Sequence, residues 1–419
     1  MTTTTRREIN LTAVERAAAD AFVFGYPLVL MGWLRAHSPV GAFRHERPPA
    51  GAAPAPDTLG SSAWLDLSEQ RVVLSVPEAH GQYYVLSLID MWARVFASIG
   101  PRTTGSAARR FVIAGPRFVG DALPAGILPI TSPTDGVRIA GQTRLEPDAG
   151  STWRLQNGLR LEHPAGGGLP YQRAELPDPG GPELRSTEGV AHLDTIGAPA
   201  FLTELEVLLA ANPPPPSDHG LLARLRAAGV LPLDHAPDHD VSLALERGLE
   251  AARARIHDAA IPLSAHPRGR WRVRPGARAD LDHLGRAAAA YAGLETAAAG
   301  DEVSATVDED RDGRPLHGGA RYELRFDVDR PPPVHGFWSL AAVGDGGCRA
   351  RLGSDDGLTV SEDGSLTIHV QPRPPAAREQ RANWLAIPAG PFRLVLRMFW
   401  PTGDVLEQRW TPPALSRVG

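Results

Sequence analysis

Two blocks of short β-prone runs flank one block with helical spacing, and this order limits the fold more than any other feature of the sequence. In the first block, β-branched and aromatic runs are separated by turn signals such as Thr134-Asp135-Gly136. Short strands that are separated by turns in this way are typical of a sandwich or a small barrel. The runs are Arg71–Val76, Gln82–Asp90, Arg110–Ala114, Gly126–Ile130 and Val137–Leu145.

The middle of the chain has the apolar spacing of helices, and the last part returns to β-prone runs. A further helix, Leu11–Arg35, is expected before the first block, with a kink at Pro27. The middle helices are expected at Ala198–Ala211, Asp218–Ala228, Val241–Asp258 and Ala279–Ala292. The later strands are expected at Arg321–Val328, Val334–Val343, Ser365–Gln371, Phe392–Phe399 and Val405–Trp410. The sequence therefore predicts an N-terminal helix (1–40), a sandwich (41–165), a helical segment (190–295) and a second sandwich (300–419).

The composition excludes several kinds of chemistry. All 43 basic residues are arginine, so Schiff-base catalysis, lysine-bound pyridoxal phosphate and a Walker-A lysine are excluded. The one cysteine, Cys348, excludes an internal disulfide and a multi-cysteine metal site. The net charge of −5 offers no general attraction for nucleic acid. We expect no cofactor, no metal site and no nucleic-acid partner.

The apolar run Ala21–Leu34 is 14 residues long and contains Gly25 and Pro27. It is shorter than the roughly 20 residues that a membrane-spanning helix needs, and no basic segment with a cleavage site precedes it. A buried core helix is preferred to a membrane-surface helix. With one unpaired cysteine, this indicates a cytoplasmic protein without a membrane span.

Two groups of short motifs resemble known families. The first consists of the stretch Asp57–Leu67 followed by Gln82-Tyr83-Tyr84-Val85, Asp90-Met91-Trp92 and Arg102-Thr103-Thr104-Gly105. It resembles the domain-of-unknown-function family 1254. The second consists of Asp312–Leu316, Phe337–Leu340, Asp363–Leu366, Asn383-Trp384-Leu385, Pro388–Phe392 and Trp400-Pro401. It resembles the partner family 1214.

This resemblance implies a mainly β protein with an immunoglobulin-like N-terminal sandwich, a helical middle segment and a C-terminal jelly-roll-like sandwich. It implies no particular reaction. The chain departs from the family pattern in the first motif, where two Asn and a Tyr are replaced by Ala55, Pro56 and Gly60, and at Gln82, where the family carries Arg.

The segment from Asp57 to Asp66 is the strongest candidate site. Asp57 is a candidate acid or base, and carboxylate, hydroxyl and indole groups cluster around it, so a ligand site is predicted. The alternative is that the polar groups hold a turn while the indole fills the core. The candidate ligand-binding residues of this segment are Thr58, Ser61, Ser62 and Trp64.

Asp90 is the second candidate acid or base. It follows an apolar strand in which Tyr84, Leu86 and Leu88 share its face, and a carboxylate in such surroundings has a raised pKa. Tyr84 and Trp92 are candidate ligand contacts beside it. The alternative is a buried structural acid paired with Arg94 or Arg102.

Three further residues are candidates for ligand contact. Arg102 and Thr103 form a motif that is able to clamp an anion, although a polar turn explains the same residues. Asn383, next to Trp384, either contacts a ligand or holds a turn.

Two functions remain open at this point. One is a cofactor-free enzyme or binding protein for a small apolar or mixed-polarity ligand, in lipid or specialised metabolism, working through the carboxylates of Asp57 and Asp90. The other is a non-catalytic assembly or interaction protein, with a homo-oligomer as one form of it.

Overall fold

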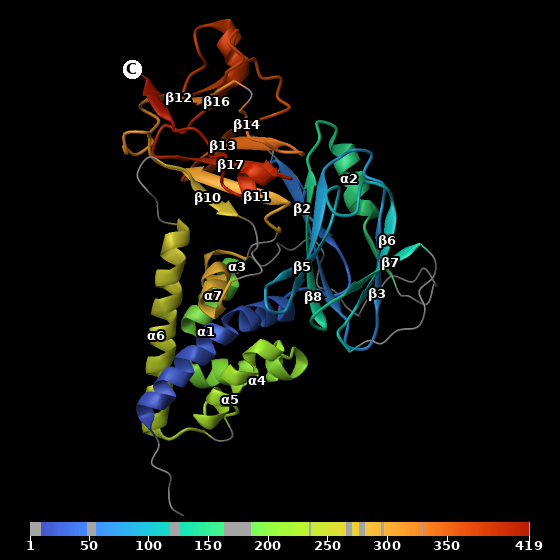
Figure 1. The fold of residues 1–419 in the computed structure, drawn as a ribbon, viewed down its shortest axis with the longest axis vertical. Helices are drawn as coiled ribbons and strands as arrows, with labels where there is room; N and C mark the ends of the chain where they lie inside the picture. Colours follow the sequence, from blue (N-terminus) through green and yellow to red (C-terminus); the bar gives the residue numbers. More distant parts are fainter. Residues whose placement is uncertain are drawn as a thin grey trace, which may run out of the picture.

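The computed structural model describes residues 10–47, 56–117, 126–162, 186–233, 236–264, 270–275, 281–294, 297–328 and 330–418. These residues form an N-terminal pair of sheets, a C-terminal pair of sheets and a helical body (Figure 1). This confirms the predicted mainly β class with a helical middle.

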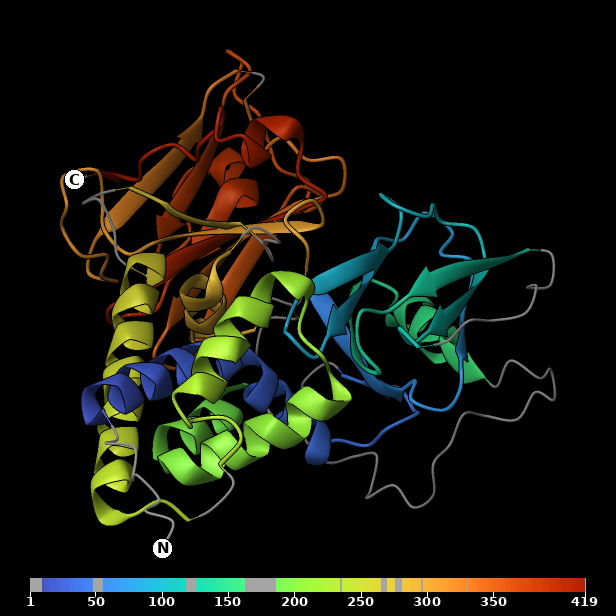
Figure 2. The ribbon, with the colours of Figure 1, turned by 60° about the horizontal axis from the view of Figure 1, so that its bottom comes forward.

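Helix α1 (Leu11–Ala36) is the centre of the helical body. The side chain of Asn10 caps its first turn by accepting a hydrogen bond from the backbone N–H of Ala13, and Pro27 lies inside it. The other helices pack around it, so that α1 is buried on most sides and crosses α6 (Figure 2). They are α3 (Ser186–Thr195), α4 (Ala198–Ala211), α5 (His219–Ala227), α6 (His239–Ser264) and α7 (His283–Ala292).

By length and composition alone, α1 is apolar enough to cross a membrane, and it is the one such helix among the described residues. Its most apolar 18-residue window is 78% buried inside the protein. The apolar side chains of α1 therefore have a packing role within the helical body, whose core they share with residues of α4, α5, α6 and α7.

The N-terminal sandwich consists of a five-stranded and a four-stranded sheet. The first has the order β1 (Arg44–His45), β2 (Thr58–Asp66), β8 (Gly136–Arg144), β4 (Tyr84–Asp90) and β5 (Val95–Ile99). The second has the order β7 (Ile127–Thr131), β6 (Arg109–Ala114), β3 (Val72–Val76) and β9 (Arg160–Glu162). Helix α2 (Ala149–Gly158) leads from β8 to β9.

The C-terminal sandwich also has a five-stranded and a four-stranded sheet. The first has the order β10 (Arg272–Pro275), β11 (Glu302–Val307), β17 (Arg393–Phe399), β13 (Trp338–Gly344) and β14 (Gly347–Gly353). The second has the order β16 (Trp384–Ala386), β15 (Leu366–Gln371), β12 (Arg321–Phe326) and β18 (Ser416–Val418). Their shared core is one apolar cluster, separate from that of the N-terminal sandwich.

One predicted strand is wrong. The run Val405–Trp410 contains the short helix α8 (Gly403–Leu406) and a turn in which Gln408 has a φ of 58°. Local hydrogen bonds explain the difference, because the backbone N–H groups of Glu407 and Trp410 donate to the carbonyls of Gly403 and Asp404. Alternating hydrophobicity over so short a run does not outweigh these bonds.

The strand β4 explains how the three regions meet. Leu86 and Leu88 point into the N-terminal core, as alternation requires. On the opposite face, Val85 belongs to a cluster shared with the C-terminal sandwich, and Ile89 belongs to the cluster of the helical body. The outer face of this sheet is therefore the common contact surface of all three regions.

A first prediction concerns the crossing of α1 and α6. A Cβ atom at Gly248 would lie 2.4 Å from the backbone oxygen of Glu15 and 2.8 Å from the Cβ of Ala18. Gly248→Val should therefore lower the free energy of unfolding by about 1–3 kcal/mol in urea titrations, because the helices have to separate.

The matched control is Gly220→Ala in α5, where an added Cβ meets nothing within 4 Å. It should leave stability unchanged or raise it by up to about 1 kcal/mol. Equal destabilisation by both variants would contradict the close helix crossing.

Candidate functional site

Asp57 lies where the two sandwiches meet, immediately before β2, and is only 7% exposed. Its Oδ2 accepts a hydrogen bond of 2.6 Å from Ser339 Oγ, and its Oδ1 accepts one of 3.1 Å from Arg351. A guanidinium nitrogen of Arg397 lies 3.7 Å from Oδ2. All three partners come from the C-terminal sandwich, on β13, β14 and β17.

Arg397 extends this contact into a charged network. Its Nε donates to Glu302 at 2.7 Å, and another of its nitrogens donates to the side-chain oxygen of Gln142 at 3.1 Å. The amide nitrogen of Gln142 in turn donates to Glu302 at 2.9 Å. Burial alone lowers the pKa of Arg397, but Glu302 and Asp57 reverse the effect and hold that pKa above its ordinary value. Arg397 therefore remains a cation at the interface.

An aromatic cluster lies beside the network. Phe337 stacks on Phe399 with ring centroids 4.2 Å apart, and Tyr83 from the N-terminal sandwich meets both rings edge-on. The hydroxyl of Tyr83 donates to the backbone oxygen of Asp301 at 2.9 Å. Burial, followed by the nearby charges of Asp301 and Glu302, raises the pKa of Tyr83, so it stays a neutral donor.

Arg102 and Thr103 have partners within the protein. Arg102 makes two hydrogen bonds to the Asp301 carboxylate, at 2.7 and 2.9 Å, and Ser98 donates to the same carboxylate at 2.5 Å. Thr103 donates to the backbone oxygen of Ser98 at 2.7 Å. The anion that Arg102 holds in this structure is Asp301, which ties the two sandwiches together a second time.

A cleft of about 350 Å³ opens beside Asp57, between the two sandwiches. We call it the inter-sandwich cleft. Its lining residues from the N-terminal sandwich are Asp57, Arg144, Leu145, Glu146, Pro147 and Ala149, and those from the C-terminal sandwich are Phe337, Trp338, Arg351, Gly353, Ser354, Asp355 and Asp356.

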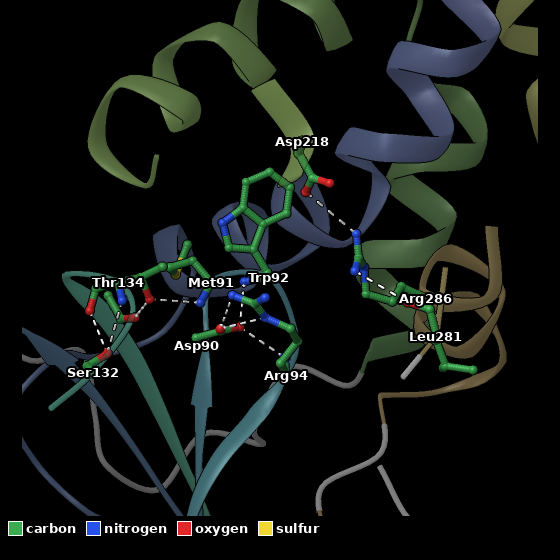
Figure 3. Close-up of polar contacts among 10 residues, drawn as sticks. Asp90, Met91, Trp92, Arg94, Ser132, Thr134, Asp218, Leu281 and Arg286 are labelled. Carbon is green, nitrogen blue, oxygen red and sulfur yellow. Dashed lines mark hydrogen bonds and ion pairs between the residues drawn. The ribbon is translucent and has the colours of Figure 1, made fainter. Parts of the chain in front are cut away.

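Asp90 is the last residue of β4, and its environment differs from that of Asp57 (Figure 3). It is fully buried, and its carboxylate accepts hydrogen bonds from the backbone N–H groups of Trp92 and Arg94 and from the Arg94 side chain. Burial raises the pKa of Asp90, and the charge and hydrogen bonds of Arg94 offset only part of that shift. This is the structural ion pair that the sequence left open as an alternative.

Trp92 points from this turn toward the helical body (Figure 3). Its ring lies 5.0 Å from that of Phe24 in α1. Within the helical body, the carboxylate of Asp218 lies 2.9 Å from His283 and 4.0 Å from Arg286 of α7. Trp92 thus anchors the sandwich to the helices rather than lining the inter-sandwich cleft.

The other predicted contact residues have internal partners or are buried. Thr58 donates to Gln142, and Ser61 is hydrogen-bonded to His45 at 2.9 Å. Tyr84 donates to the backbone oxygen of Gly105 at 3.4 Å. Ser62 is buried in β2, and Trp64 belongs to the core of the helical body.

Asn383 holds a turn. Its side-chain oxygen accepts from the backbone N–H of Thr359, and its amide nitrogen donates to the backbone oxygens of Thr359 and Thr367. Among the predicted site residues, Asp57 alone lines the inter-sandwich cleft.

Sequence reasoning missed the partners of Asp57 because they lie about 280 to 340 positions away along the chain. Ser339 is 282 residues from Asp57, and Arg351 is 294 residues away. A partial signal was present, since Arg397 interrupts the apolar run Leu394–Phe399. A cation inside such a strand indicates a buried acid opposite it. Across the described part of the chain, no group of three or more His, Cys, Asp or Glu side chains could hold a metal ion.

Comparison with known families agrees with the motif pattern. Residues 40–163 match the family described as protein of unknown function (DUF1254), and residues 301–403 match the one described as protein of unknown function (DUF1214). This confirms the pairing and the order that the motifs indicated. No curated protein matches the chain.

Two solved structures are similar to the chain. The VPA0106 protein from Vibrio parahaemolyticus aligns with a TM-score of 0.73 at 19% identity, over 97% of this chain and 100% of that chain. An uncharacterised protein from Burkholderia cenocepacia aligns with a TM-score of 0.45 at 12% identity, over 97% of this chain and 94% of that chain. The first shows a shared fold over nearly the whole length.

A second prediction concerns the Asp57 contacts. Asp57→Asn keeps the shape but removes the charge that faces Arg351 and Arg397, so the free energy of unfolding should fall by about 2 kcal/mol in urea titrations. Asp20→Asn removes a half-exposed acid paired with Arg255 at 3.5 Å and should change stability little. Equal effects would show that the Asp57 contacts add no stability.

A third prediction concerns pH. Because burial raises the pKa of Asp90 in the folded state, the folded protein binds this proton more tightly than the unfolded chain does. The stability that Asp90 contributes is therefore fully present below its ordinary pKa of 3.8 and is lost as pH rises through the folded-state value. The free energy of unfolding of the wild type minus that of Asp90→Asn should decrease from acidic to neutral pH. A difference that increases with pH would contradict the raised pKa.

Proposed function

We propose that this chain, which pairs an N-terminal DUF1254 region with a C-terminal DUF1214 region, binds a small molecule of mixed polarity in the inter-sandwich cleft. The observation that carries the proposal is the cleft of about 350 Å³ that opens beside a buried carboxylate. Its volume falls within the range of roughly 300–1,000 Å³ that is usual for small-molecule sites.

Both sandwiches supply polar groups to the cleft, and these groups are held in place. Arg144 lies over the ring of Phe337, 4.3 Å from its centroid, and forms an ion pair with Asp355. Arg351 is held by Asp57. Because such side chains are already oriented, a ligand that contacts them loses little additional conformational entropy on binding.

Binding fits the geometry better than catalysis by Asp57. A general base needs an oxygen within reach of the proton that it removes. Asp57 is only 7% exposed, and its carboxylate faces Ser339, Arg351 and a guanidinium nitrogen of Arg397. Asp57 therefore positions Arg351 in the cleft wall, and the proposal includes no cofactor. In the same proposal α1 is a core helix rather than a membrane anchor.

A fourth prediction tests the site. Ala149 lines the cleft at the first position of α2, so Ala149→Trp fills the cleft without removing a side-chain hydrogen bond. Native mass spectrometry of protein purified from its own host should show a retained small molecule on the wild type. The molecule should be absent from Ala149→Trp.

The control is Ala13→Trp, at an exposed position of α1, which should retain the same mass. Retention by Ala149→Trp would place the ligand elsewhere. A native mass of twice the subunit mass, with no small molecule retained by the wild type, would favour the alternative of a non-catalytic assembly protein.

A further inference from the structure

The two surfaces that the N-terminal sandwich buries differ in how well their polar groups are satisfied. At the interface with the C-terminal sandwich, Asp57, Gln142, Glu302 and Arg397 form hydrogen bonds and ion pairs with one another. Within the described part of the chain, none of these four side chains keeps a buried nitrogen or oxygen without a partner. This interface is therefore satisfied by its own groups.

The other surface lies between the N-terminal sandwich and the helical body, and we call it the sheet–helix junction. Trp64, Ile89, Met91 and Trp92 of the sandwich belong there to the apolar cluster of the helices. The C-terminal end of α1 closes one side of it. A Cβ atom at Gly136 of β8 would lie 2.7 Å from Met91 Sδ and 3.6 Å from Cδ of Arg35 in α1.

Three side chains at the sheet–helix junction keep a buried polar atom for which the described residues offer no hydrogen-bond partner. These atoms are Nε of Arg35, Nε1 of Trp92 and Oδ2 of Asp218. Another nitrogen of Arg35 donates to Asp66 of β2 at 2.8 Å, so this guanidinium crosses the junction without being fully satisfied. Figure 3 shows Trp92 pointing from the turn after β4 toward the segment that carries Asp218.

The charges at the junction show the same imbalance. Arg286 of α7 lies 4.0 Å from Asp218 Oδ2, too far for a hydrogen bond. Burial lowers the pKa of Arg286, and the charge of Asp218 offsets only part of that shift. Burial likewise raises the pKa of Asp90 by more than Arg94 lowers it. At the interface between the sandwiches the balance is opposite, because Glu302 and Asp57 outweigh the burial of Arg397.

An unpartnered polar atom in a closed interface costs free energy, because water would bond to it if the interface were open. At the sheet–helix junction this cost opposes the apolar contacts. Between the two sandwiches, polar and apolar contacts act in the same direction. The sheet–helix junction is therefore the surface along which the protein opens first.

We propose that the helical body is a lid on the outer face of the first N-terminal sheet, and that it leaves this face as a unit while the two sandwiches stay together. Most of the apolar cluster of the helical body comes from the helices themselves, so they keep a core when they move. Opening exposes Trp64, Ile89 and Trp92 and lets water reach the unpartnered atoms. The inference does not depend on a ligand in the inter-sandwich cleft, because no residue of the helical body lines that cleft.

The test is the rate at which 5,5′-dithiobis(2-nitrobenzoate) labels a single buried cysteine in the full chain without denaturant. Each variant carries Cys348→Ser, which removes the native thiol. Met91→Cys places a thiol at the junction, Met31→Cys places one in the helical core, and Met398→Cys places one in the core of the C-terminal sandwich. The labelling rate gives the equilibrium constant for opening at each position, which is compared with the unfolding constant of the same variant from urea titration.

The opening constant at position 91 should exceed the unfolding constant of that variant by about a hundredfold or more. At positions 31 and 398 the two constants should agree. Ile89→Cys is a second variant at the junction and should behave as Met91→Cys, so the test does not rest on one substitution.

Two results would overturn the lid. Labelling at positions 89 and 91 that requires global unfolding would show that the junction stays closed in the native protein. Labelling at position 31 as fast as at position 91 would show that the helices unfold locally instead of moving together.

Discussion

The arrangement of the two sandwiches depends on one buried carboxylate of the N-terminal sandwich and on the three side chains of the C-terminal sandwich that face it. Asp57 precedes the first long strand of the N-terminal sandwich, and Ser339, Arg351 and Arg397 lie on three neighbouring strands of the C-terminal sandwich. A buried acid is costly without partners, so this contact favours one relative placement of the sandwiches over others. The cleft beside Asp57 follows from that placement.

The interface combines polar and apolar contacts in adjacent positions. Gln142, Glu302 and Arg397 satisfy one another, while Tyr83 packs against Phe337 a short distance away. The aromatic contacts supply apolar burial, and the charged groups fix the register because each has a specific partner. Because both the aromatic contacts and the charged pairs hold the two sandwiches together, the cleft walls are ordered although they come from distant parts of the chain.

Local pattern was enough to predict most of the fold and part of the site. Alternation and turn residues indicated the strand around Tyr84, and helical apolar spacing indicated the helix Ala198–Ala211, because both patterns lie within a few neighbouring residues. The pairing of Asp90 with Arg94, four residues on, was open to the same reasoning. The partners of Asp57 were not, because only the packed sheets bring them together. The short helix α8 was missed because hydrogen bonds within one turn outweighed a weak alternating pattern.

The most direct test of this account is a double-mutant cycle between Asp57→Asn and Arg351→Gln, followed by urea unfolding. If the carboxylate and the guanidinium hold the sandwiches together, the two substitutions should be non-additive by about 1–3 kcal/mol. Additivity to within about 0.3–0.5 kcal/mol would mean that the two groups are energetically independent, and the central contact between the sandwiches would be lost from the account.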